Sequence, residues 1–318
     1  MEHSIALVTG ATSGLGHAAA RLLVTKGYRQ VIVTGRSLTR IQQTATQLAA
    51  ETKTKIFTPL ELDLDAPTSV QCALAELVRL GKPIDFLLLN AGSIGGKESV
   101  LTAAGIEATQ APLIGHHQLT VGLIHANLLS RSARIVIAGS ESARGDVPLF
   151  PYTAVSALAA KHHHGDRSAA VEAVLRSGPS VKYEPRRAHS DVKLIATWWT
   201  AALSRRLPPG MAVYAVSPGS TPDTKGMRNA GPAVKWLMVP LMKLIPGMSH
   251  TPETAVHRYL QALEFGTDVS GQFFASAPRK FTGPMEAMRQ PHFRDRANQE
   301  AAWQAIVRVS GADLSPPQ

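Results

Sequence analysis

A glycine-punctuated turn near the start of the chain most constrains what it can fold into. Residues 4–16, SIALVTGATSGLG, form an apolar run that ends in this turn, and a helical pattern, HAAARLLVTKG, follows directly. The turn contains Gly10, Gly14 and Gly16. Glycines allow the backbone to turn tightly and to come close to a pyrophosphate, and the amides at the N-terminus of the following helix then point at its charge. Because a strand pattern directly precedes the turn, the sequence predicts a dinucleotide-binding unit.

Strand and helix patterns alternate along the rest of the chain. Strand patterns lie at residues 4–9, 30–35, 56–62, 84–89, 134–139 and 211–216, and a further strand is expected at 271–274. This alternation predicts a doubly wound parallel sheet with helices on both faces, a three-layer α/β/α fold. No linker or repeat divides the 318 residues, of which 44% are hydrophobic, so we expect a single domain over residues 1–318.

Several motifs resemble those of one enzyme family. The turn TGATSGLG resembles the TGxxxGxG signature of short-chain dehydrogenases/reductases, and the segment AHSDVKLIATWW resembles the YSxSKLA helix of their retinol-dehydrogenase-like branch. This resemblance implies a Rossmann-type fold, a nicotinamide dinucleotide cofactor and oxidoreductase activity. Further family markers follow predicted strands: Arg36, Asp63-Leu64, Asn90-Ala91-Gly92, Ser140 and Pro218-Gly219.

The end of the second strand predicts the cofactor. Enzymes that prefer NAD usually carry a carboxylate there, whereas a cation accommodates the 2′-phosphate of NADP. Here the strand ends in Thr34, Gly35 and Arg36, without an acid. We therefore expect NADP(H), with Ser13 at the place where the family often adds a second basic residue.

The resemblance supplies the remaining cofactor contacts. Asp63 and Leu64 match the family positions beside the adenine, and capping of a turn is the alternative role of Asp63. Thr221 is the expected backbone contact to the nicotinamide carboxamide, with Asp223 at the family's later threonine position and Thr224 one place beyond. The full expected set is Gly10, Thr12, Ser13, Gly14, Leu15, Gly16, Arg36, Asp63, Leu64, Asn90, Ala91, Gly92, Lys193, Pro218, Gly219 and Thr221.

The resemblance also implies an active site made of Asn, Ser, and a Tyr with a Lys four positions later on the same helix face. Ser140 ends the run RIVIAGS and is the expected serine, with Ser142 as the competing candidate. Lys193 lies 25 residues before Pro218, which is the usual family distance. In that register the tyrosine position is His189, so this chain carries HxxxK instead of YxxxK.

This histidine changes the expected chemistry. A neutral imidazole can accept a proton near pH 7, so His189 suits alcohol oxidation, whereas the Lys193 ammonium disfavours the imidazolium that carbonyl reduction needs. The alternative is that His189 only begins the helix and that the chemistry lies elsewhere or is absent.

Two tyrosines offer an alternative phenol. Tyr152, 12 residues after Ser140, is the alternative proton donor, and it would use Lys193 from another segment. Tyr183 has Arg187 at i+4, but the intervening proline argues against an established helix there.

The asparagine position also differs from the family pattern. GIEATQAPLIGHHQLT, at residues 105–120, resembles the branch phrase GLExTFxxNHLGHFxLT with about one residue deleted. The asparagine then falls on Ala111 or Pro112, and neither can bind the water that links the family's lysine to solvent. His116 and His117 are expected to be ordinary polar residues of a helix, with a proton relay as the alternative.

Three longer segments surround the expected site. Residues 143–187 predict two short helices that enclose the substrate, with His162–His164 on exposed surface and no metal site, because consecutive histidines cannot all point one way. Residues 221–250 predict a lid for an apolar substrate, with membrane contact or an oligomer surface as alternatives. The extension at 276–318 contains a predicted helix at 298–309 that packs on the domain or in a dimer.

Bulk properties limit the partners. The net charge is +10, but the basic residues are scattered without a nucleic-acid motif, so nucleic acid is not an expected partner. Cys72 is the only cysteine, which suits a reducing cytoplasm. The first strand pattern leaves no room for a signal peptide, and no apolar run reaches about 20 residues. We expect a cytoplasmic homo-oligomer, either a dimer or a tetramer.

Together these observations predict an NADP(H)-dependent oxidoreductase acting on an alcohol or carbonyl of a mainly apolar small molecule. Ser140 would bind the oxygen, Lys193 the ribose, and His189 would move the proton. The alternative is a non-redox protein of the same fold that holds NADP(H) as a structural or sensory ligand.

Overall fold

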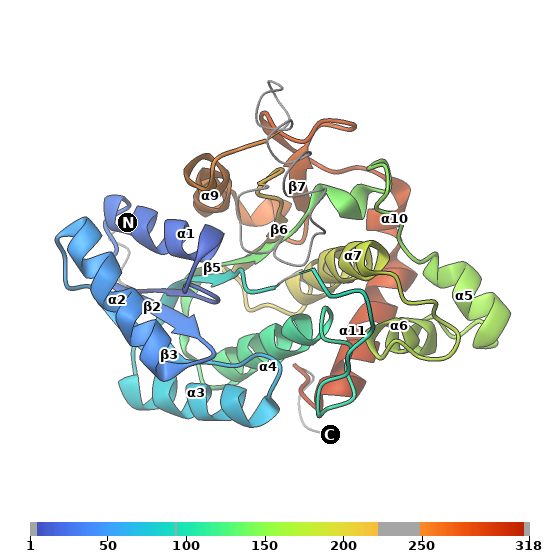
Figure 1. The fold of residues 1–318 in the computed structure, drawn as a ribbon, viewed down its shortest axis with the longest axis horizontal. Helices are drawn as coiled ribbons and strands as arrows, with labels where there is room; N and C mark the ends of the chain where they lie inside the picture. Colours follow the sequence, from blue (N-terminus) through green and yellow to red (C-terminus); the bar gives the residue numbers. More distant parts are fainter. Residues whose placement is uncertain (1–4, 93, 222–248, 315–318) are drawn as a thin grey trace.

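A computed structural model describes residues 5–92, 94–221 and 249–314 (Figure 1). Its centre is one sheet of eight strands in the order β3-β2-β1-β4-β5-β6-β7-β8. All neighbouring strands pair in parallel except the last two. The strands are β1 (Ile5–Val8), β2 (Gln30–Gly35), β3 (Phe57–Glu61), β4 (Ile84–Leu89), β5 (Leu129–Ala138), β6 (Ala212–Val216), β7 (Phe273–Ser276) and β8 (Met285–Ala287).

Helices cover both faces of this sheet, as the alternating patterns predict (Figure 1). One face carries α1 (Gly14–Thr25), α2 (Leu38–Thr52) and α9 (Pro252–Gln261). The other carries α3 (Pro67–Leu80), α4 (Ala111–His125), α7 (Pro185–Ser204) and α11 (Arg296–Ser310). The remaining helices are η1 (Glu141–Arg144), α5 (Val155–His162), α6 (Arg167–Leu175), η4 (Ala262–Glu264), η5 (Thr267–Val269) and α10 (Pro291–Arg294).

The strand β1 shows why the sheet is buried on both faces. Its alternate residues point to opposite sides, so Ile5 and Leu7 join one hydrophobic cluster and Ala6 and Val8 join the other. A strand covered on both faces needs a continuous apolar run rather than an alternating one. That requirement explains why the strand signals are short, uniformly hydrophobic segments.

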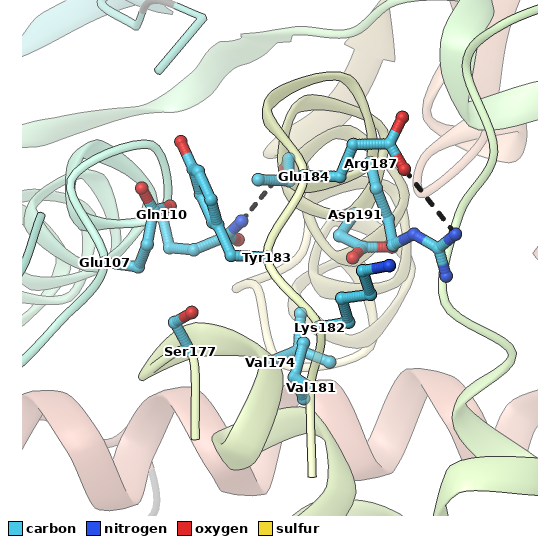
Figure 2. Close-up of a pocket in the computed structure, with 11 residues that line it drawn as sticks. Glu107, Gln110, Val174, Ser177, Val181, Lys182, Tyr183, Glu184, Arg187 and Asp191 are labelled. Carbon is cyan, nitrogen blue, oxygen red and sulfur yellow. Dashed lines mark hydrogen bonds and ion pairs between the residues drawn. The ribbon is translucent and has the colours of Figure 1, made fainter. Parts of the chain in front are cut away.

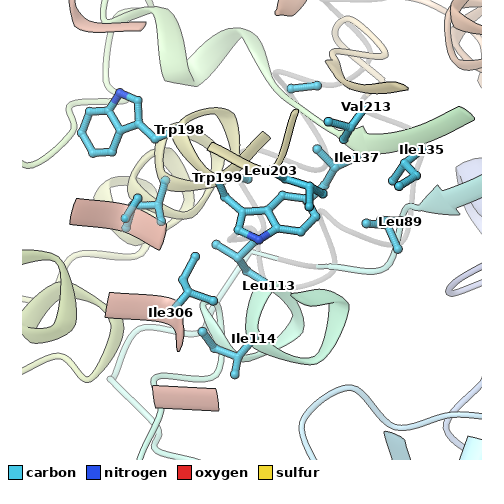
Figure 3. Close-up of a cluster of buried hydrophobic side chains, with 14 of the residues drawn as sticks. Leu89, Leu113, Ile114, Ile135, Ile137, Trp198, Trp199, Leu203, Val213 and Ile306 are labelled. Atoms are coloured by element: carbon cyan, nitrogen blue, oxygen red, sulfur yellow. The ribbon is translucent and has the colours of Figure 1, made fainter. Parts of the chain in front are cut away.

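Helix α7 is held on the sheet by large apolar side chains. Trp199 and Leu203 are fully buried and lie in one cluster with Ile137 of β5 and Val213 of β6 (Figure 3). Trp198, on another side of the helix, donates its indole N–H to the carbonyl of His292 at 2.7 Å. This packing fixes the position of α7 along the central strands.

Two strand predictions needed correction. β5 begins at Leu129, before the predicted residue 134, and its pairing with β4 changes register between Ile84 and Phe86. Polar residues in SRSAR hide this early part of the strand from a pattern based on apolar runs. β8 was not predicted, because three residues at a sheet edge carry no measurable periodicity.

The prediction that His117 is an ordinary polar residue of a helix was wrong. Its side chain is fully buried; Nδ1 accepts from the indole N–H of Trp199 at 3.0 Å, and Nε2 lies 2.8 Å from the carbonyl of Ala312. Because Nδ1 accepts, the neutral ring carries its proton on Nε2 and donates to Ala312. His117 therefore ties α4 to α7 and to the segment after α11.

We expect His117 to make folding stability sensitive to acid. Burial lowers its pKa from 6.5 to about 4, so the unfolded chain takes up a proton before the folded chain does. Stability is then fully present above pH 6.5 and decreases as pH falls toward 4, by about 2–3 kcal/mol for this one group. Urea denaturation at several pH values measures the loss.

The matched variant is His117→Gln, which keeps a donor and an acceptor but does not titrate. Its unfolding free energy is expected to depend less on pH over the same interval than that of the parent. Equal losses in parent and variant would contradict this assignment.

Candidate active site

The glycine turn after β1 forms an open cradle. Gly10 and Gly14 have φ values of 68° and 59°, a region that favours glycine. Helix α1 begins at Gly14, and its N-cap residue Ser13 makes no side-chain capping bond. Helix N-terminal amides that lack such a partner are suited to bind an anion. A Cβ on Gly16 would lie 2.3 Å from the carbonyl oxygen of Gly10, so the turn and the helix pack too closely for any side chain.

The cradle lies where the strand order reverses. β1 and β4 are neighbours, although β2 and β3 continue outward on the far side of β1. Ligands of doubly wound sheets bind in the crevice at this switch point. Asn90, just after β4, donates its side-chain amide to the carbonyl of Thr9 at 3.1 Å, so it secures the turn. Gly92 lines a cavity farther along the same crevice.

The expected 2′-phosphate site lies at the end of β2. Arg36 is exposed there, and Arg40 follows one helical turn later. Burial and the neighbouring Asp63 raise the pKa of Asp65, while Arg36 opposes that shift. The Asp63 carboxylate accepts the backbone N–H of Asp65 at 3.1 Å, which is the turn-capping role considered as the alternative. A cation is therefore available beside the crevice.

Ser140 is placed at the carboxyl end of β5. Its Oγ accepts the backbone N–H of Ser142 at 3.2 Å and lies 3.1 Å from the Ser142 hydroxyl, which donates to it. Two accepted hydrogen bonds use both lone pairs, so the Ser140 proton stays available for a substrate oxygen. Ser142 is buried, with 4% of its surface exposed, and orients Ser140.

His189 and Lys193 lie one turn apart on α7. Lys193 donates from Nζ to the carbonyl of Ala138 at 2.6 Å, and burial lowers its pKa to about 8. His189 packs edge-on against the Phe150 ring, with centroids 6.1 Å apart, and its Nδ1 is buried without a partner in the described ranges. Burial, assisted by the Lys193 charge, lowers the pKa of His189 to about 3. The imidazole is therefore neutral at physiological pH.

The structure does not bring Tyr152 to Lys193. The Tyr152 ring packs against His292 at 5.4 Å between centroids, and the next residue, Thr153, donates through N and Oγ1 to Asp191 at 2.6 and 2.8 Å. Asp191 lies two residues from both His189 and Lys193, which places it about 200° around the helix from either. The residue that follows Tyr152 is thus anchored on a different side of α7 from His189 and Lys193.

Tyr183 also lies apart from Lys193. Its hydroxyl donates to the carbonyl of Gly96 at 3.0 Å, and its ring lines a separate cavity of about 10 Å³ with Glu107, Arg187 and Asp191 (Figure 2). That volume accommodates about one water molecule. Helix α7 begins at Pro185, after this tyrosine, so no helical turn connects Tyr183 to Arg187.

The altered asparagine position faces a cavity of about 30 Å³. Pro112 lines this cavity, together with Lys193 and His116, while Ala111 is buried. His116 was predicted to be an ordinary polar residue, but it is 2% exposed and its Nε2 lies 2.9 Å from Thr9 Oγ1. Its spacing of four residues from Pro112 is the signal that could have placed it at the site.

A buried ion cluster, also missed in the sequence, joins the Ser140 loop to the Pro218-Gly219 loop. Glu141 accepts the Ser217 hydroxyl at 2.5 Å and pairs with Arg258 at 3.4 Å. The Ser217 Oγ accepts in turn the N–H of Gly219 at 3.1 Å, where φ is 80°. The cluster orients the loop expected to hold the nicotinamide. Most of the expected lid, with Asp223 and Thr224, lies outside the described residues.

The inserted segment forms α5 and α6 where two short helices are predicted. His162 and His164 are exposed, His163 hydrogen-bonds Ser180 at 3.2 Å, and Asp166 caps α6 through the N–H of Ala169. Cys72 is exposed on α3. In the described part of the chain, no helix combines the length and apolar character needed to cross a bilayer.

Comparison with known proteins agrees with this architecture. A sequence model of the family described as short chain dehydrogenase matches residues 4–162. The chain belongs to this family. The zebrafish (Danio rerio) WW domain-containing oxidoreductase is 27% identical over 100% of this chain and 71% of its own length. Human (Homo sapiens) retinol dehydrogenase 12 is 25% identical over 96% of this chain and 86% of its own length.

A solved structure supports the same fold. An actinorhodin polyketide ketoreductase variant crystallised with NADPH superposes with a TM-score of 0.58 at 22% identity, over 85% of this chain and 94% of that chain. The family model confirms the expected membership of the short-chain dehydrogenases. The cradle around Gly10, Gly14 and Gly16 fits the pyrophosphate of a dinucleotide, because it combines open helix amides with close backbone approach.

The Gly16→Ala variant is expected to bind NADPH at least about tenfold more weakly than the parent, because the added Cβ displaces the Gly10 carbonyl and opens the cradle. Fluorescence titration with NADPH measures the change. The control is Gly96→Ala, since a Cβ there meets open space and needs no unusual backbone angle. Unchanged affinity in Gly16→Ala would show that this turn does not hold the dinucleotide.

Proposed function

We propose that this short-chain dehydrogenase is an NADP(H)-dependent oxidoreductase that interconverts an alcohol and a carbonyl in a mainly apolar small molecule. The observation that carries the proposal is the bond from Nζ of Lys193 to the carbonyl of Ala138, two residues before Ser140 at the carboxyl end of β5, with His189 one turn away on the same helix. A relative named retinol dehydrogenase and a structural neighbour crystallised with NADPH agree with this reaction and cofactor.

The preference for NADP(H) rests on the end of β2. Thr34 and Gly35 are buried and Arg36 is exposed, so this strand end offers a cation and no carboxylate. A guanidinium recognises a phosphate dianion through charge and paired hydrogen bonds, whereas a ribose hydroxyl pair needs an acceptor.

The arrangement favours alcohol oxidation. Ser140 donates its free hydroxyl proton to the substrate oxygen, and the neutral His189 accepts the proton that the alcohol loses. Bound NADP⁺ would supply the acceptor for the hydride that leaves the alcohol carbon. Because the Lys193 ammonium opposes a second positive charge on His189, proton transfer becomes easier when Lys193 is neutral. The products are a carbonyl, NADPH and one proton.

An apolar substrate is supported by the composition of residues 231–248, which are rich in Met, Leu and Val. The cavity of about 30 Å³ beside Lys193 has room only for water and is too small for such a substrate.

The Arg36→Asp variant is expected to change cofactor selectivity toward NADH. The new carboxylate repels the 2′-phosphate and accepts the ribose hydroxyls, so the ratio of NADPH to NADH affinity should fall by at least about tenfold. Calorimetric titration with both cofactors measures the ratio. Arg79→Asp makes the same charge change on exposed α3 and should leave the ratio unchanged. If both variants change the affinity ratio equally, the effect comes from the net charge of the protein, and Arg36 does not contact the 2′-phosphate.

His189 is tested by replacement with Ala and Tyr. Absorbance at 340 nm is followed with NADP⁺ and a panel of apolar alcohols, and with NADPH and the matching carbonyls. His189→Ala is expected to lower kcat by about 10²–10⁴-fold, and His189→Tyr, which restores the family residue, should regain much of that loss.

The pH profile is a further readout of the same variants. Oxidation by the parent should rise as pH increases through about 8, where Lys193 loses its charge. If His189→Ala reacts at the wild-type rate, His189 does not take part in the reaction.

A non-redox protein that holds NADP(H) is the second candidate. It is favoured by the placement of Tyr152 and Tyr183 away from Lys193. NADPH binding without any substrate-dependent absorbance change across the panel would establish this candidate in place of the oxidoreductase.

A further inference from the structure

His116 faces Lys193 across a cavity but has no part in the chemistry proposed above. The cavity of about 30 Å³ lies between α4 and α7, below the ends of β4 and β5. It has room for one or two water molecules. Among the described residues that line it there is no carboxylate, so the ammonium of Lys193 has no anionic partner there.

The hydrogen bonds of Thr9 determine which nitrogen of His116 carries the proton. Thr9 Oγ1 accepts the backbone N–H groups of Asn90 and Ala91 at 2.8 and 3.1 Å. These two bonds use both lone pairs of the hydroxyl. Its own proton therefore points to His116 Nε2 at 2.9 Å, the nearer of its two acceptors. Since Nε2 accepts, the neutral ring is protonated on Nδ1.

Both groups that face the cavity consequently have donors to spare. In the described part of the chain the His116 ring bonds only to Thr9, through Nε2, so Nδ1–H is left over, and Nζ of Lys193 uses one of its three protons on Ala138. A water molecule offers two lone pairs, so one water can accept from Nδ1 and from Nζ together.

We propose that His116 is a positioning residue that holds a water molecule against Nζ of Lys193. The proposal rests on the proposed function, in which Lys193 binds the ribose and its charge governs proton transfer at His189. The water solvates the ammonium without introducing a second charge, since burial and Lys193 keep the pKa of His116 at about 3. His116 does not conduct the proton onward, because the Thr9 hydroxyl behind it contacts only backbone amides, a backbone carbonyl and this ring.

The test measures the pKa of Lys193 in the free protein. The rate at which Nζ is acetylated is followed from about pH 6 to about pH 10 by peptide mass spectrometry, since only the neutral amine reacts. His116→Leu removes the donor for the water, so the Lys193 pKa should fall by about one unit from its parent value near 8. His116→Gln keeps a donor and should stay within about 0.3 unit of the parent.

The matched control is His117→Gln, on the same helix and next to His116. Its bonds go to Trp199 and Ala312, away from the cavity, so it should leave the Lys193 pKa unchanged even if it lowers stability. An unchanged pKa in His116→Leu, or an equal shift in His117→Gln, overturns the proposal.

A second measurement holds even if His116→Leu does not fold. A crystal structure of the parent at about 1.5 Å is expected to show a water within about 3.2 Å of both Nδ1 and Nζ, and its absence overturns the proposal. These readouts need no turnover. If His116→Leu shifts the Lys193 pKa but the parent shows no redox activity, the water site is supported and the proposed reaction is rejected. If the parent shows redox activity but the pKa does not shift, the reaction is supported and the water site is rejected.

Discussion

The site depends on how helix α7 is held against the sheet. Trp199 and Leu203 bury their side chains against β5 and β6, and this contact brings Nζ of Lys193 to the carbonyl of Ala138. On the other side of the helix, Asp191 binds the backbone of Thr153. These contacts place the ammonium nitrogen 2.6 Å from one carbonyl oxygen. From that position its charge adds to burial in lowering the pKa of His189 and His116.

Burial of an ammonium without a carboxylate is costly, and the surrounding residues show how the chain accommodates it. A charged group removed from water must be hydrogen-bonded or must lose its charge. Here the pKa of Lys193 falls to about 8, and His116 and His189, which its charge affects, remain neutral. In the proposed function, this buried group is the cation of adjustable charge that the reaction needs.

The architecture was predictable because the apolar runs and the glycine turn both indicate a doubly wound α/β fold. The apolar runs at β1, β4 and β6 are short and bounded by turns, and the glycines at 10, 14 and 16 have no other arrangement that suits them. The candidate site was only partly predictable. The places of Ser140 after β5 and of Lys193 on α7 follow from position along the chain, but the turn of Tyr152 toward His292 depends on contacts between distant segments. The burial of His116 and His117 was missed because α4 has apolar residues all round, so no polar face marks the direction of either ring.

The contact between His117 and Ala312 gives the end of the described chain a role beyond covering the core. His116 and His117 are consecutive, so the ring that secures the segment after α11 and the ring that faces Lys193 share one stretch of backbone. Gln118 adds a bond to the carbonyl of Ser310 at 2.9 Å. Trimming the chain back to α11 would remove the Ala312 acceptor and leave the buried Nε2–H of His117 unpaired. The short segment after α11 therefore contributes to the stability of the fold, although it lies beyond the last helix.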